Sequence, residues 1–222
     1  MPSRPVKKLS PVSVSRSQMR RDSEKAATRR LILETARAMF AREGYERTTM
    51  RAIADQIGYT ATAIYHHFAD KDTLMLELCA LDFRELGAAL ASIGGITDPI
   101  ERIMQMGRNY VRFALEHPEQ FRFMFLIDRP MPSPEEVAPF DPGEGGYEFL
   151  LKAVIDALNA GRFRAEYTDA DLLAQMLWSA MHGVATLHIA TLQQKHEWLD
   201  VRDAETTAVA LCTSLMRGLV RS

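Results

Sequence analysis

The sequence is poor in cysteine and contains no metal-binding pattern. Its 222 residues include only Cys79 and Cys212, which stand far apart without CxxC or mixed Cys/His spacing. This usage predicts neither a disulfide framework nor a zinc site. We therefore expect a protein of the reducing cytoplasm that holds no metal and needs no cofactor.

The chain also lacks a convincing membrane segment. Residues 172–194 carry no formal charge and are long enough to cross a bilayer. Six polar side chains interrupt this run, however, and lipid would not compensate for burying them. They are Gln175, Ser179, His182, Thr186, His188 and Thr191. We expect a buried helix here and no membrane contact.

Positive and negative charges are distributed unequally along the chain. Residues 1–75 carry 14 Lys and Arg against 8 Asp and Glu, whereas residues 76–222 carry 13 against 21. A basic segment of this size can neutralise phosphates, while the acidic remainder would be repelled by a polyanion and must serve another purpose. The first 23 residues are basic, rich in Ser and Pro, and lack the apolar stretch of a secretory signal. We expect residues 1–23 to form a disordered basic arm, which either adds DNA contacts or only aids solubility.

Apolar residues recur three and four apart, without sustained alternation, so we expect an all-α protein. A first helix over about residues 24–42 should end at Gly44, and Asp70 should cap a long helix that ends near Gly94. Later helices should begin at Asp98-Pro99, at Pro118, at a cap formed by Thr168-x-x-Asp171, and at Asp200. Residues 128–146 contain five prolines and three glycines, which predicts a long loop.

Residues 50–68 meet the physical demands of a helix-turn-helix. Small Ala54 lets two helices approach closely, and Gly58 permits a left-handed turn. Ile53, Ile57 and Ile64 supply the apolar wedge between the helices. Thr60 is placed to cap the second helix, whose first turn could enter a major groove. An ordinary helical hairpin is the alternative for this pattern alone.

The longer segment GYERTTMRAIADQIGYTATAIYHHFADKDTL resembles the DNA-binding signature of tetracycline-repressor-like (TetR family) transcription regulators. The resemblance covers roughly residues 27–78. It implies a three-helix DNA-binding domain over residues 24–70 and a helical ligand-binding and dimerisation domain over residues 71–222. It also implies a homodimer that places two recognition helices in successive major grooves of double-stranded operator DNA.

The resemblance assigns roles to individual residues. Thr49 and Thr60 resemble phosphate-binding hydroxyls at helix N-termini. Ala61 and Thr62 occupy the base-facing positions, where family members often have Lys or Arg and Gly, so thymine methyls or single hydroxyl contacts are expected instead of a bidentate guanine contact. Tyr65 and His67 suit packing equally well. The residues expected at the DNA are Arg47, Thr49, Thr60, Ala61, Thr62, Tyr65, His66 and Lys71.

The second half resembles a ligand-domain branch known by a Trp…His-Gly signature, here Trp178 to Gly183 preceded by HPEQFRFMF. On a helix Trp178 and His182 share one face and could line a cavity, although a core histidine with a satisfied hydrogen bond is the simpler interpretation. Several methionines suit an irregular apolar ligand or plain core filling. The expected ligand-binding residues are Met104, Tyr110, Trp178, Met181 and His182.

These features predict a ligand-responsive DNA-binding regulator, most simply a repressor released by a small, mostly apolar effector. A constitutive DNA-binding factor and an all-helical enzyme are the alternatives. For the homodimer we expect an interface on the last two helices, along an apolar seam formed by Ala204, Ala208, Leu211 and Leu215.

Overall fold

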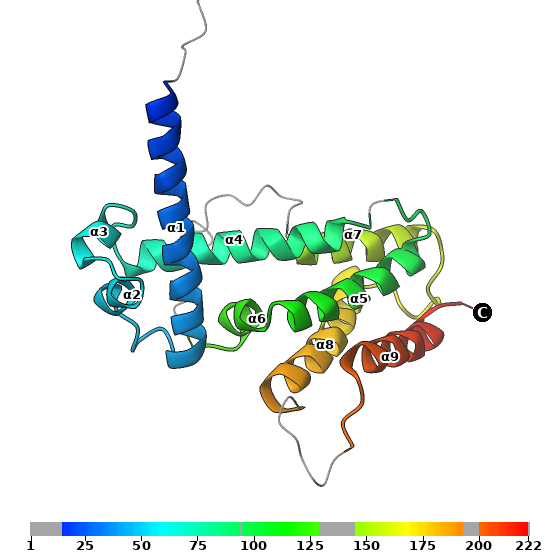
Figure 1. Ribbon diagram of the computed structural model, residues 1–222. Coiled ribbons are helices and arrows are strands. Elements are labelled where there is room, and N and C mark those ends of the chain that lie inside the picture. Colours follow the sequence, from blue (N-terminus) through cyan, green and yellow to red (C-terminus); the bar gives the residue numbers. More distant parts are fainter. Residues whose placement is uncertain (1–14, 94, 129–144, 193–199, 222) are drawn as a thin grey trace, which may run out of the picture.

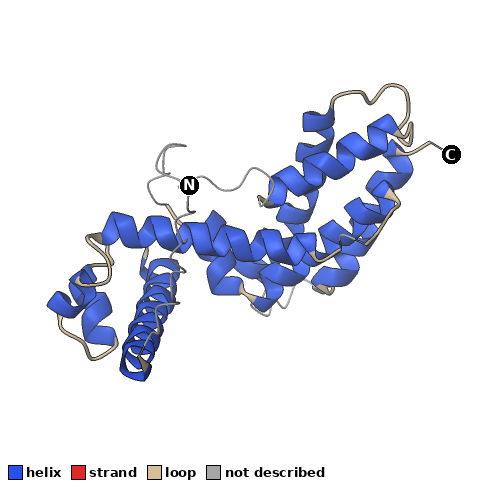
Figure 2. Ribbon diagram, turned by 90° about the horizontal axis from the view of Figure 1, so that it is seen from above, coloured by secondary structure: helices blue, strands red, loops and turns tan. Residues whose placement is uncertain are grey.

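The structure is a computed structural model that describes residues 15–93, 95–128, 145–192 and 200–221. Every regular element in these ranges is a helix (Figure 2), which confirms the all-α expectation. One isolated antiparallel bridge joins Phe163 to Val220. Within these ranges no helix is both long and apolar enough to span a membrane. The expected loop over residues 128–146 lies almost wholly outside the described residues.

The helices form two groups along the chain (Figure 1). The first group and its connecting helix are α1 (Arg16–Glu43), α2 (Met50–Gln56), α3 (Ala61–Tyr65) and α4 (Lys71–Ala91). The second group contains α5 (Pro99–Glu116), α6 (Pro118–Phe125), α7 (Gly146–Asn159), α8 (Ala170–Leu187), the π-helical turn η1 (His188–Leu192) and α9 (Ala204–Leu219).

The structure corrects the start of the first helix, which the sequence pattern predicts near Glu24. α1 begins at Arg16, where the Ser15 hydroxyl accepts the backbone N–H of Gln18 at 3.2 Å. Arg, Gln, Glu and Lys lose little rotamer freedom in a helix, so this segment is helical although its residues are exposed. The expected disordered arm therefore includes two helical turns of α1, which project from the body in Figure 1.

Local capping signals place most of the other helix starts. Asp70 and Asp98 accept the backbone N–H groups that begin α4 and α5, as predicted. The expected cap of α8 was wrong by one residue, and that of α9 was wrong by three. Asp169, not Thr168, caps α8, and Asp203, not Asp200, caps α9, because these carboxylates lie directly before the first helical residue.

Two hydrophobic cores divide the molecule. The N-terminal core is built by α1 to α3 and the first half of α4, including Leu74 and Leu78. The C-terminal core begins on the same helix at Leu86 and continues through α5 to α9. The sequence places the boundary between domains at residue 70, whereas α4 contributes to both cores. The long helix is thus a rigid connection between the two halves.

Candidate nucleic-acid interface and ligand cavity

Helices α2 and α3 form the predicted helix-turn-helix. Gly58 adopts a φ of 72°, a left-handed conformation that a residue with a Cβ rarely takes. Ile53, Ala54 and Ile64 are fully buried between the helices, and Phe68 follows in the same core. The short α3 is therefore held at a fixed angle at one end of the molecule, on the left in Figure 1.

Thr49 and Thr60 open the two helices with the same geometry. Thr49 Oγ1 accepts the backbone N–H of Ala52 at 3.1 Å, and Thr60 Oγ1 accepts that of Ala63 at 3.2 Å. Both threonines are exposed. A hydroxyl that caps by accepting still has its own O–H to donate, so each helix start offers a donor to a phosphate oxygen.

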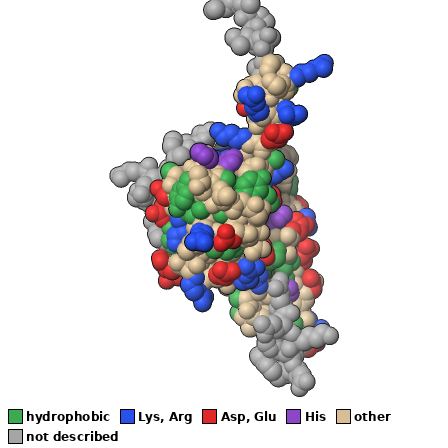
Figure 3. Space-filling model, turned by 60° about the vertical axis from the view of Figure 1, so that its left-hand side comes forward, with side chains coloured by type: hydrophobic (Ala, Val, Ile, Leu, Met, Phe, Trp, Pro, Cys, Tyr) green, Lys and Arg blue, Asp and Glu red, His purple; other side chains and the backbone are tan. Residues whose placement is uncertain are grey.

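The face of α3 that should approach DNA is open. Thr62, Tyr65 and His66 are exposed and Ala61 is half-buried. Tyr65 retains 52% exposure, which leaves its ring free of the core, whereas His67 is half-buried and burial with nearby Arg29 lowers its pKa. Figure 3 looks onto this end of the molecule, where positive side chains stand out along the projecting part of α1 and both signs occur below it.

Arg47 and Lys71 already have partners within the chain. Arg47 is exposed and its Nε donates to the carbonyl of Glu43 at 2.8 Å. Lys71 Nζ donates to the carbonyl of Tyr45 at 3.0 Å and lies 3.9 Å from the centre of the Tyr45 ring. An ammonium has three donors, so Lys71 can keep this bond and still reach a phosphate.

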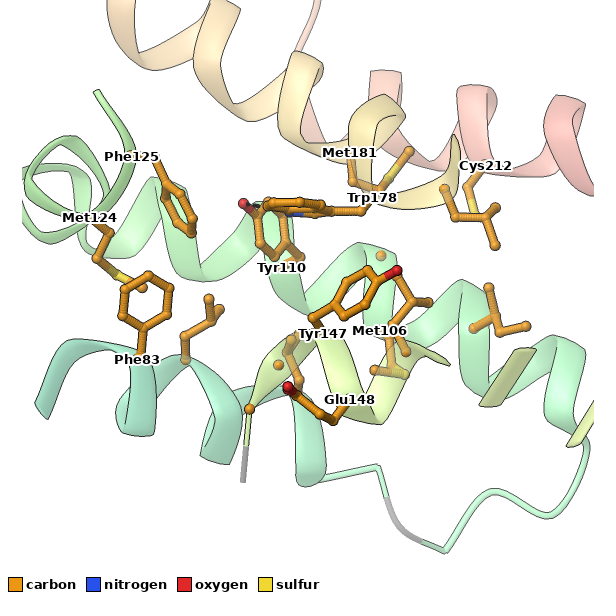
Figure 4. Close-up of a pocket in the computed structure, with 18 residues that line it drawn as sticks. Phe83, Met106, Tyr110, Met124, Phe125, Tyr147, Glu148, Trp178, Met181 and Cys212 are labelled. Atoms are coloured by element: carbon orange, nitrogen blue, oxygen red, sulfur yellow. Dashed lines mark hydrogen bonds between the residues drawn. The ribbon is translucent and has the colours of Figure 1, made fainter. Parts of the chain in front are cut away.

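A cavity of about 640 Å³ lies in the C-terminal half, between α4, α5, α7 and α8 (Figure 4). Its walls are almost wholly apolar, with five aromatic rings and three methionines among them. The lining residues are Phe83, Leu86, Leu90, Ile103, Met106, Gly107, Tyr110, Met124, Phe125, Gly145, Gly146, Tyr147, Glu148, Leu150, Leu177, Trp178, Met181 and Cys212.

A small polar cluster stands at one wall of the cavity. The hydroxyl of Tyr110 lies 2.8 Å from Nδ1 of His182 and accepts the indole N–H of Trp178 at 3.3 Å. Burial raises the pKa of Tyr110 and lowers that of His182, so both side chains are neutral near pH 7. The cluster can therefore orient a polar group on a ligand but does not supply a positive charge.

The structure brings three of the five expected ligand residues to the cavity wall: Tyr110, Trp178 and Met181. His182 lies behind Tyr110 with its hydrogen bond satisfied, as in the simpler interpretation of this residue. Met104, the fifth expected residue, is not among the lining residues. Its side chain packs against the core, and Met106 lines the cavity instead, because successive helical residues point about 100° apart.

Sequence reasoning missed the contribution of α4 and α7. Phe83, Leu86 and Leu90 recur at helical spacing on α4, and Tyr147 is the second residue of α7. The spacing on α4 was a usable signal of a buried face, but nothing in it distinguished a cavity wall from ordinary packing.

Helix α6 joins the cavity to the N-terminal core. Phe123 is fully buried in that core and stacks on Phe40 of α1 with ring centres 5.7 Å apart. Met124 and Phe125, the next residues, line the cavity. Side chains of one short helix thus touch both halves of the molecule.

A buried ion pair reinforces the same joint. Asp82 of α4 is fully buried and accepts hydrogen bonds from the guanidinium of Arg37 on α1, the Nε bond measuring 3.1 Å. Burial raises the pKa of Asp82 to about 6, although Arg37 and Gln120 act in the opposite direction. Gln120 of α6 also donates to Glu85 at 2.8 Å. Polar groups of α1, α4 and α6 therefore meet at one point.

Comparisons with protein families agree with this architecture. Residues 32–78 match the model of bacterial regulatory proteins of the tetR family, and residues 103–211 match the tetracyclin repressor-like C-terminal domain. The HTH-type transcriptional repressor Rv1474c of Mycobacterium tuberculosis is 45% identical over 99 residues, which are 45% of this chain and 46% of that protein. The repressor AcnR of Corynebacterium glutamicum is 36% identical over 97 residues, 44% and 45% of the two chains. The chain thus spans about half the length of the curated relatives it matches.

Solved structures show the same fold over most of the chain. The TetR family regulator PfmR from Thermus thermophilus aligns with a TM-score of 0.66 and 27% identity, covering 86% of this chain and 96% of that one. FadR from Bacillus subtilis, in complex with stearoyl-CoA, aligns with a TM-score of 0.69 and 16% identity, covering 85% and 97%. With a helix-turn-helix and a helical C-terminal domain that each match their family model, the chain belongs to the tetR family of bacterial regulatory proteins.

Proposed function

We propose that the protein is a transcriptional repressor that a small, mostly apolar effector releases from operator DNA. The observation that carries this proposal is the continuity of α4. The helix begins three residues after the buried Phe68 that follows α3, and about three turns further on its Phe83, Leu86 and Leu90 form a wall of the cavity. An effector that moves this wall also moves the DNA-binding helices.

The relatives support the repressor assignment by their names, and the matched family is one of regulatory proteins, not of enzymes. FadR, which shares the fold, binds stearoyl-CoA, so the fold is compatible with a long apolar ligand. Such a repressor would act in the cytoplasm, where its operator lies. The DNA contacts we propose remain those of Arg47, Thr49, Thr60, Ala61, Thr62, Tyr65, His66 and Lys71.

Two contacts would transmit the effector signal. One is the wall of α4, and the other is α6, whose Phe125 lines the cavity while its Phe123 packs in the N-terminal core. Both half-sites of an operator are met only when the two recognition helices of a dimer are about 34–36 Å apart. A small rotation of α4 in each subunit would change that separation and lower the affinity for DNA.

The structure favours a different set of residues for the dimer interface from the seam expected on the last helix. Ala204 and Ala208 of the predicted seam are buried within one subunit, because this face of α9 packs against α5. The outer face of α8 carries instead a largely exposed stripe at helical spacing, formed by Leu172, Met176, Ser179, Gly183 and Leu187. Leu172 and Leu187 are 54% and 57% exposed, which is costly for a free surface. We propose that α8, together with the outer face of α9, pairs with a second copy.

The dimer proposal is tested by Leu187→Glu, which places a charge on the stripe, with Lys152→Glu at an exposed position of α7 as the control. Light scattering should give the dimer mass for the control and the monomer mass for Leu187→Glu, with operator affinity lost in parallel. A dimer of unchanged stability in Leu187→Glu would remove α8 from the interface.

The regulatory proposal is tested with DNA taken from upstream of the protein's own gene. A mobility-shift assay should show saturable binding that competitor DNA of random sequence does not abolish, and apolar compounds that raise the melting temperature should release the DNA. Specific DNA binding that no stabilising compound alters would favour the constitutive factor instead. Absence of DNA binding at low ionic strength would refute the repressor assignment.

A further inference from the structure

The cavity is asymmetric in charge. Among the 18 described residues that line it there is no Lys or Arg, and Glu148 is the single carboxylate. The thiol of Cys212 stays protonated because burial raises its pKa. The nearest polar cluster is neutral, since burial lowers the pKa of His182 and keeps it uncharged. Among the described residues of the wall, a ligand therefore meets no side chain that compensates a negative charge.

The exposed lining residues mark where the cavity opens. Glu148 is exposed and Trp178 is 38% exposed, whereas most of the remaining wall is buried or half-buried. Tyr147 lies between them, with its ring 6.0 Å from that of Trp178 and its hydroxyl donating to the carboxylate of Asp171 at 3.2 Å. The opening thus combines two aromatic faces with two carboxylates, the arrangement that attracts a cation.

One feature of the opening would favour an anion, namely the N-terminus of α7 with its free backbone N–H groups. Glu148 is the third residue of this helix, and its carboxylate is folded back against Gly145, so closely that a Cβ on Gly145 would collide with it. The chain's own carboxylate thus lies against the start of this helix, where a ligand anion would meet a second carboxylate.

Two cations on helices that line the cavity, Arg108 of α5 and Lys152 of α7, are not among its lining residues. Arg108 acts on Cys212 electrostatically, but its guanidinium is bonded to Gln105 at 2.7 and 3.0 Å and is not part of the wall. Lys152, one turn after Glu148 on α7, is exposed to solvent. Neither lines the cavity, so among the described residues the charged side chains at the opening are those of Glu148 and Asp171.

We infer that the effector is a lipophilic cation, an amine or quaternary ammonium compound whose apolar body fills the cavity. Its positive head lies at the opening, beside Glu148 and the rings of Tyr147 and Trp178. This inference rests on the proposed function for the site and adds the charge of the ligand to it. A carboxylate of the same length would leave an unpaired charge at an apolar, acidic opening and bind more weakly.

The test uses three probes with the same ten-carbon chain: decyltrimethylammonium, decanol and decanoate. Calorimetric titration of the full-length protein, below the aggregation concentration of each probe, should give the tightest binding for the ammonium compound. Decanoate should bind at least about tenfold more weakly. Trp178 fluorescence should respond to the ammonium compound, and Trp178→Phe should remove that response, which locates the probe in the cavity.

Glu148→Gln keeps the shape of the opening and removes its charge, with Glu166→Gln on an exposed loop as the control. Because Glu148 is exposed, solvent screens it, and its loss should reduce the preference for the ammonium probe over decanoate by about threefold, with no change in the control. A preference that both variants keep equally would overturn the role of Glu148. Equal or tighter binding of decanoate, or binding of none of the probes, would overturn the inference as a whole.

Measurement of operator binding on the same samples separates this inference from the proposed function. Selective binding of the ammonium probe without release of DNA would refute effector control and leave the charge preference intact. Release of DNA by decanoate but not by the ammonium probe would support effector control and refute the charge preference.

Discussion

The N-terminal and C-terminal halves of the molecule are both helical, but they place different demands on their residues. In the N-terminal half, individual residues fix the backbone: Gly58 makes a left-handed turn, and Thr49 and Thr60 cap short helices. In the C-terminal half, the cavity wall consists mainly of apolar side chains, and Tyr110 with its two partners forms a small hydrogen-bonded cluster among them. A DNA-binding surface must match one partner of fixed shape, whereas a cavity needs mainly volume and the right charge.

This difference explains why the sequence of the first half assigns roles to many residues, whereas that of the second half offers only the short signature from Trp178 to Gly183. We propose that the effector signal passes from the cavity to the DNA-binding helices through the few residues that contact both halves. These residues lie on α4 and α6, at the junction of the two cores.

The largest expected effect concerns two neighbouring phenylalanines of α6. Phe123 and Phe121 are both fully buried, the first in the N-terminal core and the second in the C-terminal core. Each change to Ala should cost about 3–5 kcal/mol of unfolding free energy, which urea denaturation would measure. Phe123→Ala should also weaken DNA binding while ligand affinity persists, and Phe121→Ala should do the reverse.

Because such losses can unfold a domain, Phe123→Leu and Phe121→Leu provide milder versions of the same comparison. If both leucine variants change DNA and ligand binding equally, α6 does not divide its contacts between the halves as proposed.

The second effect is a pH dependence of the unfolding free energy, caused by the buried Asp82 where α1, α4 and α6 meet. The pKa of Asp82 is about 6 in the folded protein, above its usual 3.8. Between pH 4 and pH 6, therefore, the folded state keeps this carboxyl protonated while the unfolded state has already lost the proton. The contribution of this group to stability is therefore present below about pH 4 and falls as the pH rises through 6. The loss amounts to about 3 kcal/mol.

Urea midpoints of the wild type and Asp82→Asn, compared from pH 4 to pH 7, measure this contribution. The stability of the wild type relative to the variant should decrease over that range. A difference that is constant with pH would show that Arg37 keeps the carboxylate ionised throughout.

A smaller effect contrasts two helix caps of the same kind. Thr60→Ala in the N-terminal half and Asp203→Ala in the C-terminal half each remove one capping hydrogen bond, at 3.2 and 2.7 Å. Thr60→Ala should cost about 1 kcal/mol in thermal denaturation, and Asp203→Ala should also lower the melting temperature. Only Thr60→Ala should lower DNA affinity in fluorescence anisotropy, and a comparable loss in Asp203→Ala would mean that the effect is one of stability alone.

The smallest effect is the salt dependence of DNA binding. Lys71→Ala should reduce the slope of log K against log salt by about 0.9 for each phosphate that the protein no longer neutralises, equally for all sequences. Lys152→Ala on α7 should leave the slope unchanged. Thr62 variants should instead change the base preference. An unchanged slope in Lys71→Ala would mean that Lys71 serves only Tyr45, to which it is bonded.

Much of the fold was predictable because its signals are local. The turn at Gly58, the caps at Thr49, Thr60, Asp70 and Asp98, and the helical spacing of apolar residues each act within a few residues of the chain. The start of α1 was missed because exposed polar residues give no spacing signal, although Ser15 is a capping residue.

The sequence by itself determined where most helices begin and where the helix-turn-helix lies, because backbone geometry and capping depend on nearest neighbours. Tertiary structure decided that Met106 and not Met104 faces the cavity, that Phe123 crosses into the other core, and that Ala208 packs inside the subunit. An apolar stripe on a helix predicts that something covers it. Whether the cover is another helix, a ligand or a second copy depends on how distant parts of the chain pack together.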